Sequence, residues 1–134
     1  MPVRYLLDTD TFSYAVSNRY PEVRRHLRSL TTVPVLSSIS LAEILYGVRK
    51  KRSQKLESMV GLFTELVEVR DFTSSAANEY ARIRNLLEDS GQLIGNMDML
   101  IAAVAKAEGL TLVTNNTAHF SRIAKLKIVN WVKR

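Results

Sequence analysis

The sequence of 134 residues contains no cysteine, which excludes disulfide bonds and thiolate metal sites. It also lacks an apolar run long enough to span a bilayer, since the longest late run, MLIAAVA, is far too short. Near the N-terminus, Asp8 interrupts the apolar residues too early for a signal peptide. These absences fit a reducing compartment, and we expect a cytoplasmic protein with no membrane partner.

Internal repeats, low-complexity tracts and linkers are absent as well. The apolar fraction of 46% and the charged fraction of 24% are those of an ordinary globular protein. We therefore expect one domain over residues 1–134, large enough to bury a core without disulfides.

Positive charge is in excess, with 19 Lys and Arg against 13 Asp and Glu, a formal net charge of +6 and a pI near 9.8. The basic residues form three clusters: Arg24, Arg25 and Arg28; Arg49, Lys50, Lys51 and Arg52 with Lys55; and Lys125, Lys127, Lys133 and Arg134. Each cluster alone is typical of a solvated helix face. Together they indicate a polyanionic partner, although an acidic protein would explain them equally well.

Hydrophobic periodicity predicts strands that alternate with helices. We expect strands at residues 3–7, 35–38 and 111–114, with shorter ones at 67–70 and 127–129. Helices are expected at 11–16, around 23–30, from 40 into the basic run, around 56–67, at 75–88 and at 98–108. Gly109 is expected to end the last of these. This order predicts an α/β fold, a three-layer α/β/α sandwich around a parallel sheet of roughly five strands.

Several polar residues fall where such a sheet binds its ligands, at the carboxyl ends of strands near the reversal of strand order. Asp8 ends the first strand, and Glu43 lies in the first turn of the helix after the second. Asp98 opens the apolar helix, and Asn115 and Asn116 follow the strand at 111–114. We expect these residues to converge on one edge of the sheet.

Each of these acidic residues also has a purely structural explanation. Asp8 or Asp10 can cap the next helix, and Ser40 with Glu43 matches a capping box. Asp98 can complement a helix dipole. Its helix, however, is apolar almost all round and offers no Lys or Arg within one turn, so the carboxylate is expected to be partly buried and to need a partner.

If Asp8, Glu43 and Asp98 meet, repulsion between like charges raises their pKa values unless a cation holds them together. Oxygen ligands without His or Cys favour Mg²⁺ or Mn²⁺ over zinc. A basic surface around an acidic metal pocket is what a nuclease needs.

Five segments, in order, resemble the PIN-domain ribonucleases of the VapC toxin type. They are LLDTDT, SISLAEILYG, GQLIGNMDMLIAAVA, TLVTNNTAHF and IVNW, and they run from the first strand to Trp131. The most specific is the pattern G-x-x-I-G-x-x-D-x-L-I-A-A-x-A. The resemblance implies an α/β/α sandwich and cleavage of single-stranded or loop regions of RNA with Mg²⁺, for which Mn²⁺ substitutes.

The resemblance also assigns residues. Asp8, Glu43 and Asp98 match the three principal acidic positions of the family, as catalytic residues and metal ligands. A fourth, weaker acidic position falls on Asn116 or Asn115. We favour Asn116 and expect one tightly held ion, because an asparagine lowers the charge of the site.

Hydroxyl side chains of Thr9, Ser38 and Thr114 are predicted to support the acidic residues, although capping at strand ends explains them as well. Asp10 stands where similar toxins have Asn, and it is predicted to be a helix cap rather than a catalytic residue. His119 replaces part of what is often an Arg-Glu pair, and contact with substrate is left open for it.

The resemblance further implies a homodimer and a cognate antitoxin whose tail lies over the acidic pocket. We expect an Arg of such a tail to pair with the carboxylates. The RNA substrate is not specified by the sequence, and tRNA or another structured RNA is the candidate.

Three alternatives compete. A catalytically silent PIN domain would bind RNA without cutting it. A haloacid-dehalogenase-type phosphatase would use Asp8 as nucleophile and Asp10 as acid/base, but the later acidic pair is missing after TLVT. A helix-turn-helix module is disfavoured because a charge run, rather than a short turn, follows Gly47.

Overall fold

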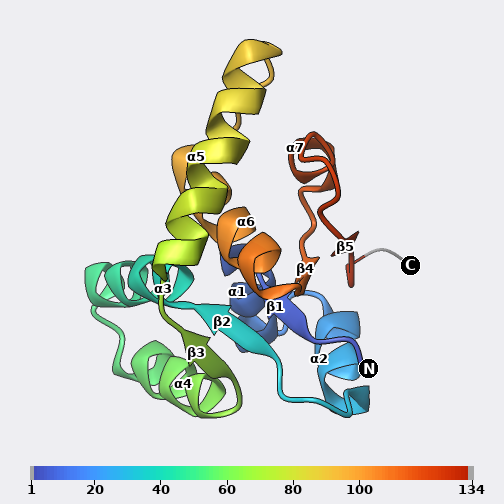
Figure 1. The fold of residues 1–134 in the computed structure, drawn as a ribbon. Coiled ribbons are helices and arrows are strands. Elements are labelled where there is room, and N and C mark those ends of the chain that lie inside the picture. The colour runs from blue at the N-terminus through green and yellow to red at the C-terminus, as the bar shows by residue number, and fades with distance from the viewer. Residues whose placement is uncertain (1, 133–134) are drawn as a thin grey trace.

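The computed structural model describes residues 2–132, which form five strands and seven helices (Figure 1). The strands are β1 (Tyr5–Leu7), β2 (Val35–Ser37), β3 (Glu68–Arg70), β4 (Thr111–Val113) and β5 (Ile128–Val129). The helices are α1 (Thr9–Ser17), α2 (Pro21–Ser29), α3 (Ser38–Lys51), α4 (Gln54–Glu65), α5 (Ser74–Asp89), α6 (Asn96–Glu108) and α7 (Thr117–Phe120).

The strands form one parallel sheet in the order β3-β2-β1-β4-β5. The chain moves outward from β1 through β2 to β3, and then returns to place β4 on the other side of β1. Leu7 consequently lies between Leu36 of β2 and Val113 of β4. Strand order reverses between β1 and β4, which is where open α/β sheets form their ligand crevice.

Alternating residues of the three central strands build a separate core on each face of the sheet. The two sets are Leu6, Val35 and Leu112, and Leu7, Leu36 and Val113, all fully buried. The first set packs with residues of α5, α6 and α7, and the second with residues of α1, α2, α3 and α4. The three-layer α/β/α sandwich and its five-stranded parallel sheet, both predicted from the sequence, are confirmed.

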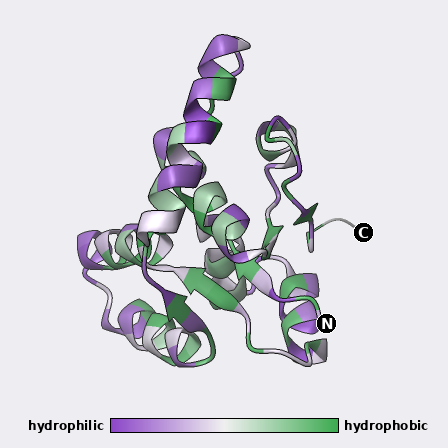
Figure 2. Ribbon diagram, in the orientation of Figure 1, coloured by the Kyte–Doolittle hydropathy of each residue, from purple (hydrophilic) through white to green (hydrophobic). Residues whose placement is uncertain are grey.

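Helix α6 is the central helix expected from its composition. Its residues 101–105 are all buried, and Gly109 ends it with a φ of 65°, in the left-handed region that favours glycine. Figure 2 shows apolar residues concentrated on the strands and hydrophilic residues on the projecting end of α5. No helix within residues 2–132 is long and apolar enough to cross a membrane.

Five helices begin two residues earlier than predicted, α2 and α4 among them. Helix α1 begins at Thr9, α3 at Ser38 and α6 at Asn96, because the caps are Asp8, Ser37 and Gly95. The remaining boundaries lie within two residues of the prediction, and the predicted short strand β5 is confirmed, at an edge of the sheet. Helix α7 was not predicted, because four residues are too few to produce a periodic pattern.

The core makes a direct prediction for stability. Leu112→Ala should lower the free energy of unfolding by about 2 to 5 kcal/mol, because its side chain is fully buried in the core under α5 and α6 and its strand lies between β1 and β5. Leu86→Ala, at a position that is 59% exposed on α5, is the matched control and should change it by about 0.5 kcal/mol or less. Urea unfolding followed by the fluorescence of Trp131, the single tryptophan, measures both. Equal losses in the two variants would contradict this assignment of the core.

Candidate active site

The predicted acidic residues lie at the carboxyl edge of the sheet, beside the reversal of strand order. Asp8 follows β1 directly, and Thr114 and Asn116 follow β4. Glu43 comes from α3, the helix after β2, where it falls in the second turn rather than the first. Asp98 lies in the first turn of α6, the helix that leads into β4.

Asp8 is the N-cap of α1 and is only 6% exposed. Its Oδ1 accepts a hydrogen bond from the backbone N–H of Thr11 at 2.8 Å. The hydroxyl of Thr114 also bonds to the carboxylate, whereas the hydroxyl of Thr11 donates to the carbonyl of Val113 at 3.2 Å. Burial is the largest influence and raises the pKa of Asp8 above its usual value, although these hydrogen bonds act in the opposite direction.

The prediction that Asp10 caps the helix is wrong. Because α1 begins at Thr9, the cap is Asp8, and Asp10 lies exposed in the first turn. Its negative charge nevertheless contributes to raising the pKa of both Asp8 and Asp98. Asp10 therefore adds charge to the acidic site.

Glu43 is half-buried and is held toward α1. Its Oε1 accepts a hydrogen bond of 2.6 Å from the hydroxyl of Thr9, whose Oγ1 also lies 3.0 Å from Oγ of Ser40. The capping-box explanation is wrong, because the cap of α3 is Ser37 and Ser40 lies inside the helix. A hydroxyl at the end of β1 thus orients a carboxylate that follows β2.

Asp98 is half-buried, as the apolar character of its helix predicted. Burial and then the neighbouring charge of Glu43 raise its pKa, Asp10 adds a smaller effect, and His119 acts in the opposite direction. Within residues 2–132, the ion pairs of Lys and Arg go to other carboxylates, and none involves Asp8, Glu43 or Asp98. The charge of the site is therefore not balanced by an ion pair with a Lys or Arg of residues 2–132.

The predicted hydroxyl supports differ in their contacts. Thr9 bonds to Glu43, and Thr114, fully buried after β4, bonds to Asp8. Ser38 is half-buried at the start of α3, where the capping hydroxyl belongs to Ser37.

Sequence reasoning missed two hydroxyls at the site, those of Ser40 and Thr11. Both stand three residues from an acidic residue of the site, Ser40 before Glu43 and Thr11 after Asp8. The spacing of three residues is the signal that sequence reasoning could have used. For Ser40 it was interpreted as a capping box, and for Thr11 it was overlooked.

The two asparagines after β4 have different surroundings. Asn115 is exposed, and its Oδ1 accepts a 3.0 Å hydrogen bond from Asn130. Asn116 is half-buried, its backbone N–H donates to Oγ1 of Thr114 at 2.9 Å, and its Nδ2 lies 2.8 Å from Nδ1 of His119. These contacts hold Asn116 against Thr114, which bonds to Asp8, and this favours Asn116 for the fourth position; that assignment stays a prediction.

The acidic side chains do not form a closed cage for a metal. Within residues 2–132, no three His, Asp or Glu side chains stand close enough together to hold an ion. The donors present are oxygen atoms, and Mg²⁺ typically binds through one or two carboxylates while keeping several waters. The chemistry of the donor set therefore fits a hard divalent ion, and the charges of Glu43 and Asp98 already interact.

A cavity of about 410 Å³ adjoins this site, between α1, α3 and α4. Thr9 and Glu43 line it together with Arg19 and Lys51, which stand beyond or at the C-terminal ends of α1 and α3. The cavity thus joins the acidic residues to basic ones.

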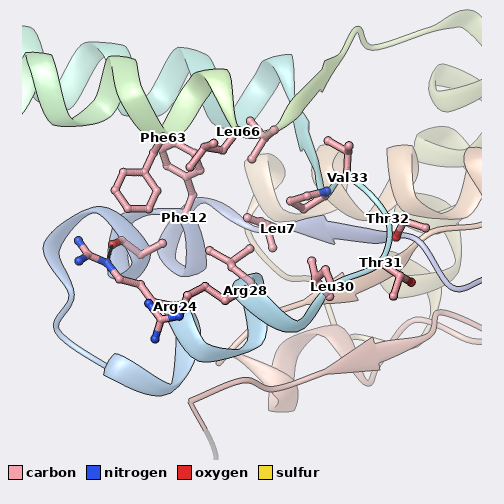
Figure 3. Close-up of a pocket in the computed structure, with 14 residues that line it drawn as sticks. Leu7, Phe12, Arg24, Arg28, Leu30, Thr31, Thr32, Val33, Phe63 and Leu66 are labelled. Atoms are coloured by element: carbon pink, nitrogen blue, oxygen red, sulfur yellow. Dashed lines mark hydrogen bonds between the residues drawn. The ribbon is translucent and has the colours of Figure 1, made fainter.

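A second cavity of about 550 Å³ lies between α1, α2, α4 and residues 30–34 (Figure 3). Its lining is largely apolar and contains no acidic side chain. Arg24 in its wall donates to the carbonyls of Ala15 and Val16 at 2.7 and 3.1 Å and stands 5.1 Å from the ring centre of Phe63. This arginine is fixed to the fold, in contrast to the solvated face predicted for its cluster.

Comparison with known proteins identifies the family. A family model of the PIN domain matches residues 5–126. The chain is 40% identical over 133 residues to Ribonuclease VapC2 of Rickettsia felis, covering 96% of this chain and 98% of that protein. The chain belongs to the PIN-domain family of VapC ribonucleases. The resemblance stated from five sequence segments is confirmed, and the general activity of a ribonuclease with it.

Two further VapC comparisons agree. The tRNA(fMet)-specific endonuclease VapC of Salmonella typhimurium is 32% identical over 130 residues, covering 96% of this chain and 98% of that one. The crystal structure of VapBC2 from Rickettsia felis bound to a DNA fragment from their promoter contains a chain that is 38% identical, with a TM-score of 0.91 and coverage of 96% and 99%. Membership of the VapC ribonucleases excludes the phosphatase and helix-turn-helix alternatives.

The unbalanced charge of this VapC site makes a prediction for stability. Asp98→Asn should raise the Tm in EDTA at pH 7 by a few degrees, the size of change that about 1 kcal/mol produces. Because folding raises the pKa of Asp98, the wild type loses stability relative to the variant as the pH rises from below 3.8 through the folded-state pKa. The gap should therefore shrink as the pH falls toward 4.

Calorimetry across pH measures this gap. Asp71→Asn, which removes an exposed carboxylate between β3 and α5, is the control for net charge and should not reproduce the gain. A lower Tm for Asp98→Asn in EDTA at pH 7 would contradict the prediction.

Proposed function

We propose that the chain is a Mg²⁺-dependent endoribonuclease, with Mn²⁺ as a substitute, and that it acts as the toxin of a toxin–antitoxin pair. Asp8, Glu43 and Asp98 are the proposed ligands and catalytic residues. The observation that carries this proposal is the half-buried Asp98, which faces the charge of Glu43 with no Lys or Arg ion-pair partner in residues 2–132. Such a carboxylate needs a compensating positive charge.

A bound divalent ion would supply a water of lowered pKa and positive charge at the scissile phosphate. The protein's contribution is to hold its carboxylates in place. Thr9 fixes Glu43, and Thr114 with the backbone of Thr11 fixes Asp8. The donors at Asp8 favour its ionised form, which is the form that binds a cation.

The basic residues supply the attraction for RNA that the acidic site does not. Arg19 and Lys51 share a cavity with Thr9 and Glu43, so a strand that places one phosphate at the acids brings neighbouring phosphates near these cations. Lys133 and Arg134 of the third basic cluster lie outside the described residues. The Salmonella typhimurium relative is named for tRNA(fMet), and we propose tRNA or another structured RNA as the substrate class.

Regulation is proposed to come from a cognate antitoxin. The Rickettsia felis and Salmonella typhimurium neighbours were solved as VapBC complexes. An arginine from an antitoxin tail would balance the charge of Asp98 and Glu43 and so compete with the ion. A homodimer is the expected oligomer of the toxin.

Activity tests the chemical assignment. Purified protein should cut RNA with Mg²⁺ or Mn²⁺ and stop with EDTA. Asp8→Asn and Asp98→Asn should each lower the rate of cleavage at least about 100-fold, because losing a ligand exceeds the effect of losing the groups that orient it. Gel analysis of RNA cleavage measures the rate, circular dichroism checks the fold, and Asp71→Asn is the control.

Two outcomes would contradict that assignment. Cleavage that survives both active-site substitutions would exclude these residues. A folded wild type that binds RNA but never cuts it, with any of these ions, would favour the catalytically silent RNA-binding alternative.

Growth tests the toxin assignment. Expression of the chain should arrest growth, and expression of Asp98→Asn at the same level should not. Co-expression of a small reading frame next to this gene in its own locus should restore growth. Arrest by both the wild type and the variant would show that the effect does not depend on cleavage.

A further inference from the structure

One polar pair beside the acidic residues has no assigned role. It joins Asn116, after β4, to His119 of α7, and both side chains are half-buried. Nδ2 of Asn116 lies 2.8 Å from Nδ1 of His119. Asn116 is itself anchored, because its backbone N–H donates to Oγ1 of Thr114 at 2.9 Å. The imidazole is thus attached to the edge of the sheet that also carries Asp8.

The orientation of the Asn116 amide in this contact assigns the ring tautomer of His119. An amide nitrogen only donates hydrogen bonds, so Nδ1 of His119 accepts. In the neutral ring that accepts this bond the proton is on Nε2, and a protonated ring carries a proton on Nε2 as well. No hydrogen bond from Nε2 to another part of residues 2–132 is present. The ring therefore offers one N–H donor in a fixed orientation.

The position of His119 relates it to both ends of the site. When it is protonated, His119 lowers the pKa of Asp98 on α6, and Asn116 connects the ring through Thr114 to Asp8, which follows β1. Hydrogen bonds therefore connect Asp8 to Thr114, Thr114 to Asn116, and Asn116 to His119. His119 in turn lies near Asp98. A lysine or arginine here would pair with Asp98 and compete with a divalent ion, whereas an imidazole N–H leaves the carboxylate free.

We propose that His119 is a substrate-contacting residue, whose Nε2–H donates to a phosphate oxygen of the RNA beside the acidic residues, and that Asn116 is the residue that positions it. This inference rests on the proposed ribonuclease function. The Nε2–H of His119 gives the site a hydrogen-bond donor for the RNA phosphates, which the neighbouring carboxylates repel. Because a phosphate oxygen is present before and during cleavage, the contact should act on RNA affinity and KM more than on kcat.

Substitutions of His119 distinguish a contact with the substrate from a purely structural role, in which the side chain only stabilises its loop. His119→Gln places an amide nitrogen near the Nε2 position and loses the contact with Asn116. His119→Asn places one near the Nδ1 position and loses the outer donor. His119→Ala removes both, and Asn116→Ala removes only the positioning contact. His26→Ala, the other histidine, stacked on Trp131 away from the site, is the matched control.

The experiment measures two quantities for each variant. Binding of a short fluorescein-labelled single-stranded RNA in EDTA, followed by anisotropy, gives Kd without cleavage. Cleavage of the same RNA with Mg²⁺ gives KM and kcat. His119→Ala and His119→Asn should raise Kd and KM about 10- to 100-fold, the worth of a hydrogen bond to a charged group. His119→Gln should recover most of that loss, Asn116→Ala should fall between, and His26→Ala should match the wild type.

Several outcomes would overturn the inference. Unchanged Kd and KM in His119→Ala would exclude a substrate contact while leaving the ribonuclease assignment intact, provided the wild type cuts RNA. Wild-type affinity in His119→Asn with a loss in His119→Gln would assign the pair to loop stability alone. If His119→Ala does not fold, the Gln and Asn variants decide, and a wild type that neither binds nor cuts RNA fails the proposed function itself.

Discussion

The pairing of β1 with β4 is the constraint on which the site depends. The backbone N–H of Asp8 donates to the carbonyl of Val113 at 3.0 Å, so the ladder continues one residue past the end of β1. That bond sets Asp8 beside Thr114, across the point where strand order reverses. A slip of one residue would exchange Leu6 and Leu7 between the two cores, and both faces of the sheet resist it because both are buried.

The register of the strands therefore fixes what the helices can deliver. Thr9 follows Asp8 and opens α1, and its hydroxyl reaches Glu43 on α3, which β2 places alongside. Asp98 arrives from the opposite layer, on the helix that the first core packs against the sheet. Burying carboxylates opposes their ionised form, and the hydroxyl and amide donors at the strand ends only partly offset this effect at Asp8. The site is thus a place where the fold gives up stability, as active sites often do.

Much of the fold was predictable because its signals are periodic. The alternation of short apolar runs with amphipathic segments defined the sheet, and Gly109 marked the end of α6. Helix beginnings were less accessible, because Asp8 and Asp10, or Ser37 and Ser40, are equally good caps by residue type. Which one caps depends on where the strand stops pairing, and that is a property of the neighbouring strands. For the same reason the sequence misassigned Asp10 and offered a capping box for Glu43.

The pair of Asn116 and His119 shows a different limit, since neither residue is informative alone. An aspartate at position 116 would only accept hydrogen bonds, so Nδ1 of the imidazole would have to donate and its proton would leave the outer nitrogen. With an asparagine at position 116, the amide nitrogen donates to Nδ1 of His119. The N–H on Nε2 then points away from Asn116. If Asn116 fills the fourth acidic position, as predicted from the sequence, the amide there and the histidine three residues later are physically linked through this contact. On the proposed role of His119, a chain with an amide rather than an acid at position 116 gains a hydrogen-bond donor beside Asp8 and Asp98.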